Sequence, residues 1–106
     1  MSASLFNLAR IRQRLLAQVL ELTDQFPSED PHGITRRLRR AVSSLPTQQR
    51  DVQAVEAARS SAAESRYLVS CARRLGYASR EELEPVAEEL SAIRKHVGRV
   101  GSGGGA

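Results

Sequence analysis

Four arginines within five residues form the group whose type and spacing best suit chemistry with an anion: Arg36, Arg37, Arg39 and Arg40. A guanidinium group is permanently charged and donates hydrogen bonds in a planar fork that suits phosphate and carboxylate oxygens. Such a cluster attracts nucleic acid through its local positive potential. On a helix, however, Arg36 and Arg40 share one side whereas the other two arginines point elsewhere. We therefore expect either a nucleic-acid contact at this block or a set of structural ion pairs with neighbouring helices.

Glu64 is a carboxylate in apolar surroundings, with Ala62, Ala63 and Leu68 nearby in the sequence. Burial of a carboxylate is costly unless a positive group pairs with it. We expect a buried structural ion pair between Glu64 and Arg39 or Arg40. No second carboxylate or histidine lies close to Glu64 in the sequence for general acid-base catalysis. No serine lies in the G-x-S-x-G turn that is typical of a nucleophilic serine. The sequence therefore favours a protein without catalytic residues.

The remaining reactive side chains do not predict a metal, a cofactor or a small-molecule substrate. His32 and His96 are far apart in the sequence, and the single cysteine, Cys71, excludes an internal disulfide and a cysteine-based zinc site. Tryptophan is absent and aromatic residues make up 4% of the chain, so a pocket with aromatic walls is not expected.

Length and charge limit the classes of protein that the chain can belong to. With 106 residues it can form one modest core of Leu, Val, Ile and Ala. We expect a single domain over residues 1–100 and a flexible Gly/Ser tail over 101–106. Lysine and arginine outnumber acidic residues 16 to 12, and Lys95 is the only lysine. This preference for arginine indicates either an anionic partner or a GC-rich genome, which encodes arginine in place of lysine. No apolar run is long enough to cross a membrane and no signal-peptide pattern is present, so we expect a cytoplasmic protein.

Apolar residues at spacings of three and four predict four helices. The first covers residues 5–22, the second carries Ile34 to Leu45, the third follows an N-cap at Asp51 and stops at Gly76, and the fourth follows Ser79. Short connections between four such helices predict an all-α, antiparallel up-down-up-down four-helix bundle. The residues that we expect in its core include Leu38, Val42, Leu68, Leu90 and Ile93.

Residues 22–46 carry the most specific pattern in the chain. An L-T-x-x-F-P ending of the first helix is followed by an acidic loop, a Gly-Ile pair, a Leu-Arg-Arg-Ala run and Ser-Leu-Pro. This order resembles the first two helices of the four-helix bundle family named after proteins encoded in 23S rRNA intervening sequences. Residues 57–79 resemble the third helix of that family, at positions that include Ala58, Arg59, Ser61 and Glu64. The resemblance covers most of residues 15–97 and implies a bundle that assembles as a ring of five subunits.

The chain departs from that family between Pro46 and Ala58, where an Asn, an Ala-Glu-Gly and a Gly-Arg motif are missing, so this hairpin is expected to be short. A related group, the accessory proteins of diversity-generating retroelements, has an Arg-aromatic-Leu run that Arg66, Tyr67 and Leu68 match. Proteins of that group contact a reverse transcriptase and nucleic acid. The resemblance therefore implies a non-enzymatic, self-associating module with RNA or a protein as partner, or alternatively a nucleic-acid-binding accessory factor of a reverse transcriptase.

The first helix predicts a surface for self-association. Its apolar residues occupy two adjoining stripes, although one stripe is enough to close a four-helix core. The second stripe includes Phe6, Leu16 and Leu20. Exposed on a small monomer, these side chains would favour aggregation, so we expect a symmetric homo-oligomer to bury them.

Overall fold

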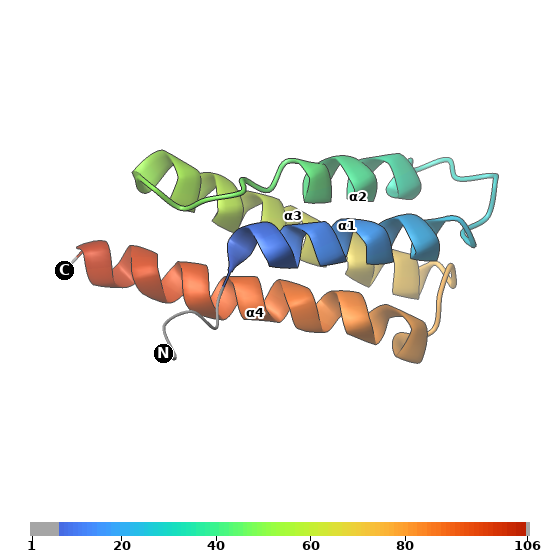
Figure 1. Ribbon diagram of the computed structural model, residues 1–106. Coiled ribbons are helices and arrows are strands. Elements are labelled where there is room, and N and C mark those ends of the chain that lie inside the picture. Colours follow the sequence, from blue (N-terminus) through green and yellow to red (C-terminus); the bar gives the residue numbers. More distant parts are fainter. Residues whose placement is uncertain (1–6, 106) are drawn as a thin grey trace.

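The computed structural model of the chain describes the backbone of residues 7–105 and the side chains of residues 7–97. It contains four α-helices: α1 (Leu8–Thr23), α2 (Ile34–Ser43), α3 (Val52–Arg74) and α4 (Arg80–Gly105). No strand occurs within residues 7–105. The predicted all-α class with four helices is therefore confirmed (Figure 1).

Local capping interactions fix the ends of α3 and α4 where the sequence predicts them. The side chain of Asp51 accepts a hydrogen bond from the backbone N–H of Ala54 at 2.9 Å. Gly76 follows α3 with a φ of 78°, a conformation that glycine adopts without a Cβ penalty. The Ser79 hydroxyl accepts from the N–H of Glu82 at 3.1 Å, and the Glu82 carboxylate accepts from the N–H of Ser79 at 2.8 Å. This reciprocal capping box starts α4.

The second helix is shorter than its apolar pattern predicts. It ends at Ser43, and Leu45 completes a turn by donating its N–H to the carbonyl oxygen of Val42 at 3.1 Å. Pro46 disfavours helical geometry at the residue before it, which explains the early end. Leu45 is nevertheless buried, so the turn still contributes to the core.

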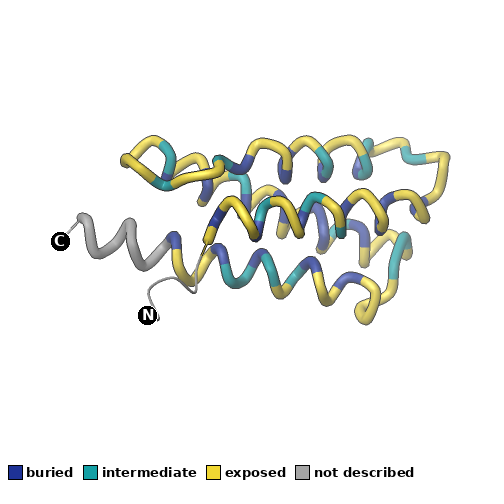
Figure 2. The backbone as a smooth tube through the Cα atoms, viewed as in Figure 1, coloured by how far each residue is buried: buried dark blue, intermediate teal, exposed yellow. Residues whose placement is uncertain are grey.

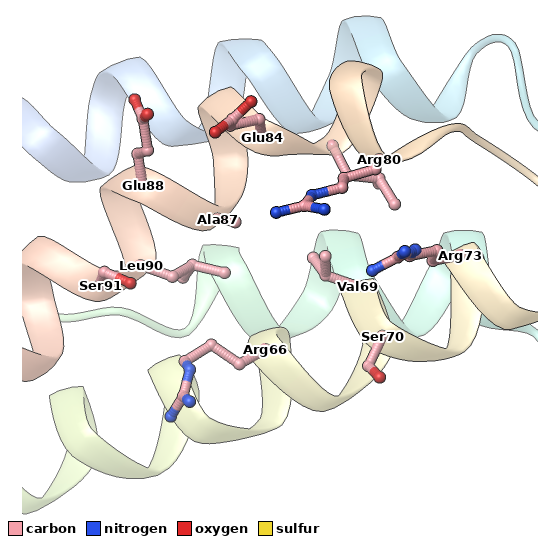
Figure 3. Close-up of a pocket in the computed structure, with 11 residues that line it drawn as sticks. Arg66, Val69, Ser70, Arg73, Arg80, Glu84, Ala87, Glu88, Leu90 and Ser91 are labelled. Atoms are coloured by element: carbon pink, nitrogen blue, oxygen red, sulfur yellow. The ribbon is translucent and has the colours of Figure 1, made fainter.

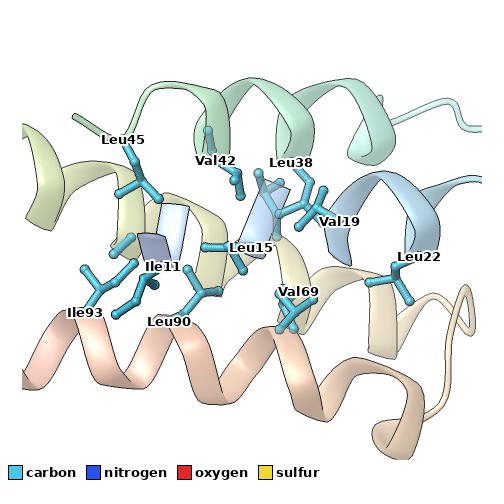
Figure 4. Close-up of a cluster of buried hydrophobic side chains, with 14 of the residues drawn as sticks. Ile11, Leu15, Val19, Leu22, Leu38, Val42, Leu45, Val69, Leu90 and Ile93 are labelled. Carbon is cyan, nitrogen blue, oxygen red and sulfur yellow. The ribbon is translucent and has the colours of Figure 1, made fainter. Parts of the chain in front are cut away.

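The four helices surround one apolar core. Each helix contacts the next along the chain, and α1 also contacts α4, so the contacts close a ring (Figure 1). Buried residues recur along the inner side of every helix (Figure 2). The five predicted core residues are all fully buried and belong to one cluster of buried side chains: Leu38, Val42, Leu68, Leu90 and Ile93. Figure 4 shows part of this cluster, including Leu38, Val42, Leu90 and Ile93.

Helix α4 begins at Arg80 and contains Pro85 at its sixth position. The N–H of Leu83 already donates to the carbonyl oxygen of Ser79 at 3.1 Å, so Pro85 lies just past the first-turn amides that lack partners within the helix. At its other end α4 continues to Gly105, although the Gly/Ser composition predicts no regular structure after residue 100. A helix that already exists gains one hydrogen bond for each added residue, so glycine weakens such an extension by about 1 kcal/mol per residue without forbidding it. The division into a domain over 1–100 and a flexible tail over 101–106 stays a prediction.

Candidate nucleic-acid interface

The arginine block on α2 is divided between two neighbouring helices. Arg39 turns toward α1, where its Nε donates to the Thr23 hydroxyl at 2.8 Å and its Nη2 donates to Asp24 Oδ1 at 3.2 Å. Arg37 turns toward α3, and its Nη2 lies 3.5 Å from Glu64 Oε2. Two of the four arginines in this block are thus engaged with carboxylates of the bundle itself.

The predicted partner and burial of Glu64 are wrong. Its side chain is 48% exposed, and it pairs with Arg37 instead of Arg39 or Arg40. Two residues correspond to about 200° around a helix, so Glu64 faces away from the buried side that Ala62 occupies. The predicted nucleic-acid contact on α2 is left with two exposed arginines, Arg36 and Arg40, for which no ion pair occurs among residues 7–97.

Five other arginines line a groove between α3 and α4, which we call the arginine groove. Arg59, Arg66 and Arg73 follow one another on α3 at seven-residue spacing, and Arg80 and Arg94 belong to α4. Seven residues are close to two helical turns, so the three arginines of α3 lie on one side of that helix. The groove therefore has arginines at regular intervals along about 21 Å of α3.

Two hollows make up the arginine groove, and they meet at Arg66. The larger has a volume of about 470 Å³ and extends past Arg73 and Arg80, whereas the smaller, of about 210 Å³, lies beside Arg59 and Arg94. In Figure 3 the guanidinium groups of Arg73 and Arg80 lie between the two helices. Apolar side chains, several of them buried, also line the larger hollow: Val69, Leu83, Ala87 and Leu90.

Four of the five arginines of the arginine groove form no direct ion pair in the part of the chain that the structure describes. Arg59 Nη1 lies 3.5 Å from Glu56 Oε2. The other four arginines have no ion pair within residues 7–97. Glu84 and Glu88 line the larger hollow, but in Figure 3 their carboxylates point away from α3. Arginines that line one groove without direct ion pairs create a positive potential that attracts phosphate groups.

The model of one protein family, the 23S rRNA-intervening sequence protein, matches residues 8–99. The chain belongs to this family. The match includes every residue of the arginine groove and of the α2 block, and it confirms the resemblance seen in residues 22–46. A comparison with curated proteins gives no match.

The arginine groove of this 23S rRNA-intervening sequence protein was not among the sites predicted from its sequence. The available signal was the regular seven-residue interval from Arg59 through Arg66 to Arg73. The denser block on α2 is more conspicuous, but density in sequence does not place side chains on one surface. The groove also needs α4, whose position beside α3 follows from packing of the whole bundle.

In this family member, the apolar surface exposed on α1 is smaller than the second apolar stripe predicted from the sequence. Leu20 is 45% exposed on α1, whereas Leu16 is half-buried and packs against the core. Phe6 lies outside the described residues. Leu20 is therefore the one large apolar side chain of α1 that is exposed among the described residues.

Two further sequence expectations concern reactive groups and membranes. Cys71 is half-buried at the edge of the core. Within the described residues, no three His, Cys, Asp or Glu side chains come together in a way that could hold a metal ion. In the same part of the chain, none of the helices combines the length and apolarity that crossing a membrane requires.

Proposed function

We propose that this 23S rRNA-intervening sequence protein is a non-catalytic module that binds the phosphate backbone of RNA along the arginine groove. The observation that carries the proposal is the row of four guanidinium groups without carboxylate partners: Arg66, Arg73, Arg80 and Arg94. Several positive charges along one groove attract a polyanion such as the phosphate backbone of RNA. The description of the matching family names no enzymatic activity, which is compatible with a binding role.

Arginine suits this role because its forked guanidinium group makes charge-assisted, often bidentate hydrogen bonds to phosphate oxygens. The contacts expected here go to phosphates, which carry no sequence information. Ser70 and Ser91 add hydroxyl groups to the larger hollow that can also donate to phosphate oxygens. We therefore expect weak, sequence-independent binding that depends strongly on salt.

The scaffold that we infer for the groove is an antiparallel up-down-up-down bundle. Its support includes the contacts of Arg12, near the start of α1, which donates to the carbonyl oxygens of Ser43 at 2.9 Å and Leu45 at 2.7 Å, at the end of α2. The short connection between α3 and α4 and the course of the chain in Figure 1 agree with this arrangement. Such a hairpin keeps α3 and α4 side by side, which holds the arginine row in place. The expected cytoplasmic location stays a prediction.

Salt dependence provides the first test of the proposal. Binding to single strands loses affinity with salt at a slope of about −0.7 in log K against log concentration for each phosphate neutralised. Four arginines therefore predict a slope of roughly −3 between about 50 and 200 mM salt. The measurement is fluorescence anisotropy of a labelled uridine homopolymer titrated with the protein. A matched strand with a neutral peptide backbone should not bind, and an RNA affinity that is independent of salt would contradict phosphate binding.

Self-association is a second proposed property, and the exposed Leu20 on α1 favours it. A second copy of the chain that covers Leu20 would remove apolar area from water. The family resemblance implies a ring of five subunits, and the half-buried Leu16 can contribute only its outer part to such a contact.

We expect light scattering coupled to size exclusion to give the parent protein a mass several times 11.6 kDa. Leu20→Glu places a charge in the proposed contact and should shift the mass toward 11.6 kDa. The matched control is Leu75→Glu, because Leu75 has the same 45% exposure but lies at the end of α3. A parent mass near 11.6 kDa would rule out the proposed association.

A further inference from the structure

Another hollow lies between α2 and α3, and we call it the α2–α3 hollow. Its volume is about 340 Å³, and its lining includes Arg40 on α2 and Ser60 and Ser61 on α3. Arg40 is exposed, and its side chain has no hydrogen bond or ion pair in the part of the chain that the structure describes. Arg37 lines the same hollow but is paired with Glu64. Arg40 is therefore a positive side chain that is available to an anion outside the arginine groove.

The α2–α3 hollow and the arginine groove lie on opposite flanks of α3. This helix lies between α2 and α4 and contacts both of them (Figure 1). Glu64 lines the α2–α3 hollow and Arg66 lines the groove, and the two residues that separate them correspond to about 200° around the helix. A helix with its side chains is about 10–12 Å wide. Arginine side chains therefore border a ridge of about this width on both sides.

Hydroxyl groups occur along the ridge between the two flanks. Ser60 and Ser70 are both exposed on α3. Ser60 also lines the α2–α3 hollow, and Ser70 lines the arginine groove. The exposed surface of α3 thus combines small polar side chains with positive charge on either side.

From this arrangement we infer that the ridge of α3 accepts an RNA duplex, with the phosphates of one strand in the arginine groove and those of the other strand at Arg40. The inference rests on the proposed function and adds the form of RNA that is bound. A duplex presents two rows of phosphates, one on each side of its minor groove, and in RNA this groove is wide and shallow. Hydroxyl groups on the ridge can reach the 2′-hydroxyl groups that the minor groove displays. A single strand has one row of phosphates, which the arginine groove alone can bind.

The test compares Arg40→Gln with Arg10→Gln on a labelled RNA duplex and on a labelled uridine homopolymer of equal length. Arg10 is the matched control, because it is also exposed and without an ion pair among the described residues but belongs to α1. Loss of one charge-assisted phosphate contact should weaken duplex binding by Arg40→Gln at least about fivefold. Homopolymer binding by Arg40→Gln, and binding of both RNAs by Arg10→Gln, should stay within about twofold of the parent protein.

Glu64→Gln should change duplex binding in the opposite direction. The substitution removes the carboxylate 3.5 Å from Arg37 and leaves that guanidinium group free for a phosphate, so duplex binding should become about two- to fivefold tighter. Homopolymer binding should not change. The matched control is Glu56→Gln, which releases Arg59 in the arginine groove and should strengthen binding of both RNAs. Both ion pairs are exposed, so neither substitution is expected to disturb the fold.

The parent protein should bind the RNA duplex more tightly than the homopolymer, and more tightly than a DNA duplex of the same sequence, which lacks the 2′-hydroxyl groups. Duplex affinity that is unchanged in Arg40→Gln would overturn the inference but leave phosphate binding in the arginine groove intact. Equal affinity for the RNA and DNA duplexes, or tighter binding of the homopolymer, would overturn it in the same way. Absence of binding to either RNA would overturn the proposed function as well.

Discussion

Leu90→Ala is expected to lower the free energy of unfolding by about 2–5 kcal/mol. Leu90 is fully buried on α4 and belongs to the cluster of aliphatic side chains drawn from all four helices (Figure 4). The substitution removes apolar atoms from the core and leaves a cavity that the helices fill only in part. For a domain of this size, a change of 1 kcal/mol shifts the melting temperature by roughly 4–8 °C. Urea and thermal unfolding followed by circular dichroism measure the effect.

Leu75→Ala is the matched control for this prediction, because it deletes the same atoms from a side chain that is 45% exposed. We expect it to cost less than about 1 kcal/mol. Equal melting curves for Leu90→Ala and the parent protein would show that α4 presents a different face to the core.

The helices and the core could be predicted because the signals for them are local. The start of α4 depends on Ser79 and Glu82, which are three residues apart, and the end of α3 depends on Gly76. The inner face of each helix follows from a spacing of three and four apolar residues. Even the early end of α2 has a local cause in Pro46.

The partners of charged side chains could not be predicted in the same way. Arg37 and Glu64 are far apart in sequence, and their pairing depends on the rotation of α2 and α3 about their axes. Arg39 lies only two residues from Arg37 but reaches the opposite neighbour, α1, at Asp24. A rotation of about 100° per residue is enough to change the partner helix, so a dense run of arginines does not define a surface.

The arginine groove could be predicted from the sequence only in part. The interval between Arg59, Arg66 and Arg73 indicates a shared side of α3 from sequence alone. Whether such a side faces solvent, a carboxylate or another helix depends on tertiary packing. Here the packing of α4 adds Arg80 and Arg94 to the same row, and no spacing rule links those two residues to α3.

Replacement of Arg66, Arg73 and Arg80 by glutamine together is expected to weaken RNA binding at least 100-fold at low salt. Each charge-assisted contact with a phosphate contributes about 1 kcal/mol or more, and the substitution removes three of them. The salt slope should also become smaller by about 2, since each lost phosphate contact removes about 0.7. All three side chains are exposed and have no ion pair within residues 7–97, so the fold should remain stable.

The control variant carries glutamine at Arg10, Arg36 and Arg40. These arginines are also exposed and without ion pairs in the described part of the chain, and the net charge changes by the same amount. Two of them belong to the α2 block that the sequence predicts as a nucleic-acid contact. The control therefore separates a general effect of charge from binding at a particular groove.

The most direct test of RNA binding in the arginine groove is one set of anisotropy titrations of a labelled uridine homopolymer at a single low salt concentration. The parent protein, the groove variant and the control variant are titrated side by side. We predict that the control binds within about threefold of the parent and that the groove variant binds at least 100-fold more weakly. A groove variant that binds as tightly as the parent, with the loss confined to the control, would contradict this account and place the phosphate contact on α2.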